Sequence, residues 1–134
     1  MKTKIIILFV TLTIIIIGIT AGIMIHFFNQ ADTENQETIG TALTWSQMDP
    51  LPESAEGFIV RTMGSPASQE FIITFTAAPE DIDMWINNSI GTKDVTPSKE
   101  DFELTYPIKP LDAKFAQIVV NTKTNDVTIH VYLD

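Results

Sequence analysis

The longest apolar run of the sequence lies near its N-terminus, from Ile5 to Phe28. Its twenty-four residues include no Asp, Glu, Lys or Arg, and His26 is the only ionisable side chain among them. A helix of this length extends roughly 36 Å at about 1.5 Å per residue, enough to cross a hydrocarbon core of about 30 Å. Because lipid cannot satisfy unpaired backbone amides, a single spanning segment must be helical. The pattern therefore predicts a transmembrane helix over residues 5–28.

The charges on either side of this run are unequal. Lys2 and Lys4 precede it, whereas three acids follow it before Gly40. The positive-inside bias then places a tail of residues 1–4 in the cytoplasm and the rest of the chain on the opposite side of the cell membrane. The lipid bilayer is thus the first expected partner.

A cleaved signal peptide is the alternative to an anchor. Its apolar core usually holds only about 7–15 residues before small residues at the cleavage site. Here the apolar run continues to Phe28, and the candidate cleavage positions after Ala21 and Ala31 have Ile19 and Asn29 two residues upstream. We therefore expect an uncleaved, single-pass signal anchor.

A polar stretch follows the predicted anchor. Residues 29–40 have no apolar periodicity and predict a short stalk, which leaves residues 41–134 for one extracytoplasmic domain. At the start of that domain, in residues 41–47, Leu43 and Trp45 alternate with polar residues, which predicts a strand. We expect Trp45 to cover the core, although an exposed contact is the alternative.

Four β-rich runs follow, in two pairs. The first pair is Phe58–Met63 and Glu70–Thr76, and the second is Lys114–Asn121 and Val127–Leu133. Turn-forming residues separate the members of each pair, so each predicts an antiparallel hairpin. Alternation places six apolar residues on one sheet face: Phe71, Ile73, Phe75, Val127, Ile129 and Val131.

A helix is predicted between the two hairpins. Pro79 suits the first helical position, where its missing N–H costs nothing, and Gly91 suits the stop. Carboxylates favour the positive end of the helix dipole, and three occupy the first turn: Glu80, Asp81 and Asp83. The apolar residues fall at helical spacing and should cover the sheet: Ile82, Trp85, Ile86 and Ile90.

Residues 92–110 give mixed signals. The spacing from Ser98 to Asp101 resembles a capping box, which predicts the start of one helical turn. Phe102, Leu104 and Tyr106 then alternate toward Pro107, which an edge strand tolerates. The whole pattern predicts an α+β protein, in which one N-terminal transmembrane helix precedes a small domain with a mostly antiparallel sheet covered by one helix.

Charge limits the partners that this domain could bind. Beyond Gln30 the chain holds six Lys and Arg against seventeen Asp and Glu, a net charge of −11. This balance argues against nucleic acid, whose phosphates require a basic surface. It favours either simple solubility beside a negative membrane or the attraction of a cationic protein partner.

The residue types that catalysis requires are scarce. The chain has no Cys, and His130 is the only imidazole beyond the anchor, so a His-rich metal site is excluded. Ser65 follows a glycine but lacks the second glycine of a nucleophile elbow. His130 would share a solvated strand face with Thr128 and Tyr132, where the three could form a polar site. We expect no enzyme activity, no metal and no cofactor.

The best candidate for partner binding is the segment from Asp94 to Asp112. It combines an apolar pair with an acidic rim, formed by Phe102 and Tyr106 with Glu100, Asp101 and Glu103. An apolar centre with a charged rim is typical of protein interfaces. A solvated loop that covers two core aromatics would show the same pattern.

The junction from Ile73 to Ile82, of sequence ITFTAAPEDI, precedes a terminal hairpin. In this it resembles small bacterial membrane-anchored proteins of unknown function. The resemblance implies an α+β domain and no particular activity. We expect an anchored binding or accessory module that acts by protein–protein interaction, such as a subunit of an envelope complex. An immunity-type inhibitor of a cationic toxin is the alternative, and a hydrolase is the third choice.

Overall fold

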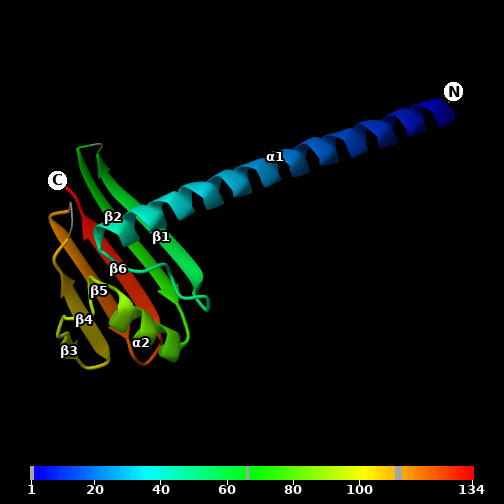
Figure 1. Cartoon of the computed structure of the whole chain (residues 1–134). Coiled ribbons are helices and arrows are strands. Elements are labelled where there is room, and N and C mark those ends of the chain that lie inside the picture. The colour runs from blue at the N-terminus through cyan, green and yellow to red at the C-terminus, as the bar shows by residue number, and fades with distance from the viewer. Residues whose placement is uncertain (1, 66, 111–112) are drawn as a thin grey trace. The chain divides into compact units, whose positions relative to one another are not determined.

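The computed structural model (Figure 1) describes residues 2–65, 67–110 and 113–134, without the side chains of residues 2–6, 8, 9 and 28–31. The chain divides into two compact units, Met1–Gln36 and Glu37–Asp134. One long N-terminal helix is followed by a six-stranded antiparallel sheet and a second helix. The protein is therefore α+β, as expected from the sequence.

Helix α1 spans Lys2–Trp45. Within the described part of the chain it is the one helix long and apolar enough to cross a membrane. Two of its hydroxyls are satisfied within the helix, since Thr11 and Thr20 donate to carbonyl oxygens four residues back, at 2.6 and 2.8 Å. Such internal bonds leave no hydroxyl of these two residues to be satisfied by lipid.

The helix continues well beyond the apolar run. Residues 29–40, expected as an unpatterned stalk, are helical, and the strand expected at residues 41–47 is wrong. Ile39 and Ala42 are buried and Leu43 packs against them, so the apolar spacing here is that of a helix face. The alternation of Leu43 and Trp45 is too short to distinguish a strand from this helical period.

The end of α1 has a regular stop signal. Gln47 adopts a left-handed conformation with φ of 55°. Its N–H donates to the carbonyl of Thr44 at 3.2 Å, and the N–H of Met48 donates to Leu43 at 2.9 Å. This pair of bonds is a Schellman motif, which satisfies carbonyls that the helix end would otherwise leave free.

All neighbouring strands of the sheet are antiparallel, in the order β1-β2-β6-β5-β4-β3. The strands are β1 (Glu56–Ser65), β2 (Ser68–Thr76), β3 (Ser98–Glu100), β4 (Glu103–Ile108), β5 (Phe115–Asn121) and β6 (Asp126–Tyr132). Both expected hairpins, β1–β2 and β5–β6, are confirmed. β6 pairs with β2, so the first and last hairpins lie side by side.

The helical turn expected at Ser98 is wrong. Strand β3 occupies Ser98–Glu100, and Asp101, with φ of 48°, forms the tight turn into β4. β3 pairs only with Glu103–Thr105. Pro107 therefore lies in the part of β4 that β3 does not cover, where a missing N–H breaks no bond on that side.

Helix α2 spans Pro79–Asn88 and starts as expected, with Pro79 in its first turn. The hydroxyl of Ser54 accepts the N–H of Ala78 at 3.0 Å and donates to the Asp81 carboxylate at 2.5 Å. One side chain from a distant loop is thus bonded to the start of the helix. The expected stripe holds for three residues only, since Ile90 lies beyond the helix end and is 65% exposed.

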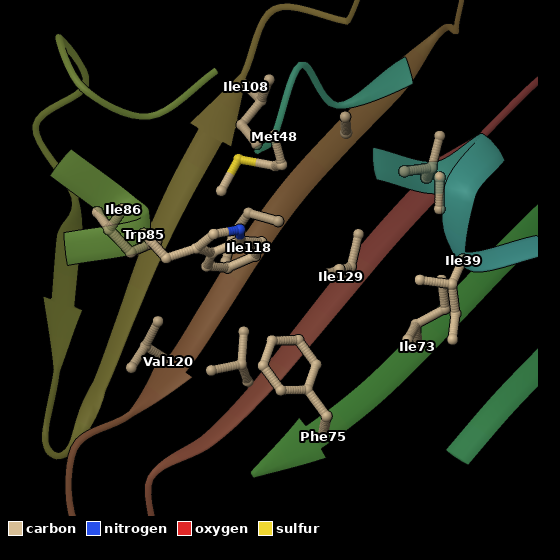
Figure 2. Packing of buried hydrophobic residues seen from close by; sticks show 14 of the residues in the cluster. Ile39, Met48, Ile73, Phe75, Trp85, Ile86, Ile108, Ile118, Val120 and Ile129 are labelled. Atoms are coloured by element: carbon tan, nitrogen blue, oxygen red, sulfur yellow. The ribbon is translucent and has the colours of Figure 1, made fainter. Parts of the chain in front are cut away.

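The core lies between one sheet face and the two helices (Figure 2). Trp85 points from α2 onto the sheet and meets Phe75 edge-on, with ring centroids 5.8 Å apart. Its indole N–H donates to the carbonyl of Asp49 at 2.9 Å. Beside this cover, the last turn of α1 brings Trp45 to 5.4 Å from Phe71, centroid to centroid. α2 covers the sheet as expected, and the end of α1 completes the cover.

The backbone at Gly91, after α2, packs closely against the backbone at the end of α1. Its N–H donates to the carbonyl of Gln47 at 2.9 Å, and a Cβ built on Gly91 would lie 2.2 Å from the carbonyl oxygen of Ser46. Any other residue here would push the end of α1 away. Gly91 is thus required by the contact between segments rather than as a helix stop.

We expect Trp85→Ala to lower the free energy of unfolding by roughly 3–5 kcal/mol, because it removes a large buried ring and leaves a cavity. Met84→Ala is the matched control on the same helix; Met84 is 59% exposed, and its loss should cost less than about 0.5 kcal/mol. Denaturant unfolding of the full chain in detergent, followed by the fluorescence of Trp45, measures both. Equal stability of the two variants would contradict the packing of α2 on the sheet.

Candidate functional site: an open sheet face with an acidic turn

The sheet has one covered face and one open face. Every fully buried strand residue, such as Ile73, Ile118 and Ile129, lies on the face that packs with the helices. The residues that alternate with them, such as Thr74 and Thr128, are only partly buried. No helix in the described part of the chain covers this second face, so its side chains are available for contact.

His130 lies on the open face with partners from both neighbouring strands. Its Nε2 lies 2.5 Å from Oε1 of Glu70 on β2, and its ring meets Phe115 of β5 edge-on, with centroids 5.1 Å apart. The strand alternation places Thr128 and Tyr132 on the same face, as expected. Neither of them hydrogen-bonds to His130; its partner is Glu70.

The His130–Glu70 pair is only partly shielded from solvent. The exposed fractions of the two side chains are 26% and 32%. The imidazole hydrogen-bonds to a carboxylate, and no described hydroxyl hydrogen-bonds to it as the nucleophile of a Ser–His pair would.

A row of polar residues lies on the open face where β2 ends and β6 begins. The hydroxyl of Thr76 donates to Asp126 at 2.9 Å, and that of Thr124 donates at 2.6 Å. The bonds from Thr124 and Thr76 lower the pKa of the Asp126 carboxyl. Because hydrogen bonds to the charged form favour it, Asp126 adds a stable negative charge to this row.

The same row leads to the turn between β3 and β4. Asp126 lies opposite Asn121, and Asn121 lies opposite Glu103. We call residues 100–103 the acidic turn. Its four residues are Glu100, Asp101, Phe102 and Glu103, and all four side chains are exposed. Together with Asn121 they line a shallow surface hollow.

The backbone of the acidic turn is fixed against the β5–β6 loop. The Phe102 carbonyl accepts the N–H of Thr122 at 2.7 Å and the hydroxyl of Thr122 at 2.9 Å. The Phe102 ring is 54% exposed, and Nζ of Lys123 lies 5.2 Å from its centroid. The face of this ring thus already accepts a cation from the protein itself.

Tyr106 does not join the acidic turn. It lies opposite Ile118, which is fully buried, so Tyr106 belongs to the covered face and packs against the core. Burial, and secondarily the charge of Asp83 on α2, raise the pKa of its phenol. Of the five residues expected to bind a partner, the structure brings four together. Leu111 and Asp112, at the end of the expected segment, lie outside the described residues.

The acids do not gather into a ligand set for a metal. Among the residues that the structure describes, no group of three or more His, Cys, Asp or Glu side chains is placed to hold a metal ion. The carboxylate side chains of the acidic turn are exposed to solvent.

Comparison of the chain with protein-family models, curated proteins and solved structures gives no match. The site must be interpreted from its own residues.

Sequence reasoning missed Glu70 and Phe115 as partners of His130. Glu70 lies two positions before Ile72, so strand alternation places it on the open face, and this much could be found in the sequence. The pairing of β2 with β6 could not, because Glu70 and His130 are 60 positions apart in the chain. The neighbours of His130 depend entirely on that pairing.

The raised pKa of Tyr106 gives a test of its placement. The folded domain holds the phenolic proton more tightly than the unfolded chain, so stability is full below the unfolded value of 10.0 and is lost as the pH rises through the folded pKa. We expect Tyr106→Phe to reduce this alkaline loss. Tyr132→Phe, on the open face, is the matched control and should retain it. Unfolding free energies of the full chain in detergent at about pH 8 and about pH 11 measure the difference.

Proposed function

We propose that the protein is a membrane-anchored binding module whose domain, outside the cytoplasm, binds a cationic protein through the acidic turn. The apolar segment of α1 supports the anchor, and the lysines before it with the acids after it support the orientation. Among the described residues no hydroxyl hydrogen-bonds to the imidazole of His130, which supports binding over catalysis.

The observation that carries the proposal is the pairing of like charges in the acidic turn. Glu100 of β3 lies directly opposite Glu103 of β4, and Asp101 lies between them in sequence. Like charges directly opposite on paired strands destabilise a hairpin. Lys123 of the same chain lies over the Phe102 ring and forms no ion pair with these acids in the described structure. A cationic partner would relieve the repulsion.

The chemistry of the turn also supports a protein partner rather than a small cation. Phe102 supplies an exposed apolar centre, and the three carboxylates surround it. Aromatic centres with a polar rim are typical of protein interfaces. A net charge of −11 beyond Gln30, from six basic and seventeen acidic residues, would steer a cationic protein toward the domain.

The anchor and its orientation are tested first. Alkaline phosphatase fused after Asp134 should be active, because the domain lies outside the cytoplasm, while a cytoplasmic reporter at the same position should be silent. The full chain should also stay in the membrane during carbonate extraction. The reverse reporter pattern would contradict the orientation, and release by carbonate would contradict the anchor.

The binding surface is tested with nearly isosteric substitutions that remove the negative charges. A cationic protein that the full chain captures from envelope extract should no longer bind when Glu100→Gln, Asp101→Asn and Glu103→Gln are combined, because the attraction is removed without changing the turn. Its association rate should fall steeply as salt reaches physiological strength, where the Debye length is about 8 Å. Association of the purified partner with the full chain in detergent, over a salt series, measures both effects.

The control for this test removes the same charge elsewhere. Glu37, Glu53 and Asp94 are all exposed and lie outside the acidic turn. The triple change Glu37→Gln, Glu53→Gln and Asp94→Asn should leave most of the binding intact. A partner that binds the two triple variants equally, with no dependence on salt, would overturn the acidic turn as its site.

A further inference from the structure

The two edges of the sheet are built differently. At one edge β3 has only three residues, and beside it β4 carries Pro107 and the acidic turn. Short strands, proline and charge are the devices by which proteins prevent edge-to-edge pairing. At the other edge β1 has ten residues, with no proline and no lysine, and in the described part of the chain it pairs with β2 alone. Its one irregularity lies between Glu56 and Ile59, so the rest of this edge lacks such protection.

β1 exposes apolar side chains on both sides of the sheet. Val60 is partly buried and the other nine residues are exposed. The exposed fractions of Phe58, Ile59 and Met63 are 41%, 54% and 46%. A long apolar edge with free backbone N–H and C=O groups is a template for another extended strand. Only a second strand can satisfy both the backbone row and the alternating side chains.

We propose that β1 pairs antiparallel with β1 of a second copy of this chain, so that the two sheets form one continuous sheet. A two-fold axis through such a pair requires one residue to lie opposite itself. With Val60 at the centre, Ile59 lies opposite Arg61 of the other copy, and Phe58 lies opposite Thr62. No like charges then face each other, and the arginine stem covers an apolar side chain.

The alternative registers fit less well. Centring the pair on Arg61 would place two arginines opposite each other, which is destabilising. Centring it on Thr62 would shorten the overlap, because β1 ends at Ser65. The ladder with β2 is irregular between Glu56 and Ile59, which limits extension at the other end. The register centred on Val60 makes most use of the strand.

The acidic turn contributes little repulsion to a pairing through β1. The acidic turn lies at the far edge, five strand spacings from β1, or about 24 Å at about 4.8 Å per strand. This is roughly three Debye lengths at physiological ionic strength, so its charge is largely screened at β1. Within β1 itself, Glu56 and Arg61 balance each other.

The anchor favours a second copy over another partner. Copies held by α1 share one membrane and one orientation, which raises their effective concentration. Gly18 and Gly22 are spaced as in membrane helices that approach closely, and a Cβ at either would meet no atom within 4 Å in this chain. Pairing through β1 thus rests on the proposed anchor for concentration, but it does not depend on the acidic turn.

The absence of cysteine makes the edge directly testable. A residue opposite itself in an antiparallel pair has Cα atoms about 4.5–5.5 Å apart, within disulfide range. In the full chain in its membrane, oxidation of Val60→Cys should give a disulfide-linked dimer. Ser98→Cys, on the protected β3 edge, has the same anchor and is the matched control. We expect Val60→Cys to crosslink roughly tenfold faster than the control.

Two further variants test the register and the role of the membrane helix. Ile59→Cys and Arg61→Cys should crosslink with each other when co-expressed, but neither should crosslink alone. Crosslinking at Val60→Cys should persist when Gly18→Leu and Gly22→Leu are added. Equal rates at Val60→Cys and Ser98→Cys, or loss of crosslinking in the Gly18→Leu/Gly22→Leu background, would overturn pairing through β1. Neither result would bear on the acidic turn, which this experiment leaves unchanged.

Discussion

Trp85 is the residue through which the helical layer is attached to the sheet. Its ring packs edge-on against Phe75, and its indole N–H donates to the carbonyl of Asp49 in the loop after α1. The N–H of Asp49 donates in turn to the hydroxyl of Ser89 at 3.0 Å. Trp85 and Ser89 thus hold the loop at Asp49 against the helical layer above the sheet. If this loop moved away, the indole N–H of Trp85 would lose its partner, and a buried N–H without a partner is costly.

The one-sided cover explains the character of both sheet faces. The covered face excludes water and holds the large apolar residues, whereas the open face holds threonines, His130 and partly buried aliphatic residues. An antiparallel sheet can be stable with one face in solvent, provided that the other is well packed. The open face is therefore a consequence of how the core is built, and it provides surface without a cost in stability.

The charges are distributed in the same uneven way. The acidic turn lies at the edge that β3 and Pro107 protect, while β1 at the opposite edge is nearly neutral and more apolar. In the proposals made above, the acidic turn would attract a partner electrostatically and β1 would pair through its backbone. Salt screens the first interaction and leaves the second largely unchanged. The two proposed contacts would therefore respond differently to ionic strength.

The sequence by itself determined the elements whose signal is local. The apolar run of residues 5–28, the two hairpins, the start of α2 at Pro79 and the face carrying Ile82, Trp85 and Ile86 all follow from periodicity and turn chemistry, and the structure contains each of them. The α+β class follows from their order. Four of the five expected contact residues share one turn because they are adjacent in the chain.

Only the tertiary structure decided what depends on contacts between distant segments. Residues 37–45 are helical because Ile39 and Ala42 pack on the sheet, and the short pattern around Trp45 did not reveal this. Tyr106 is separated from Phe102 because Phe102 lies in the tight turn between β3 and β4, whereas Tyr106 lies within β4 and faces the core opposite Ile118. The strand order sets the partners of His130 and leaves β1 at an edge. Side-chain periodicity fixes which face a residue takes, but it carries no information on which strand lies beside it.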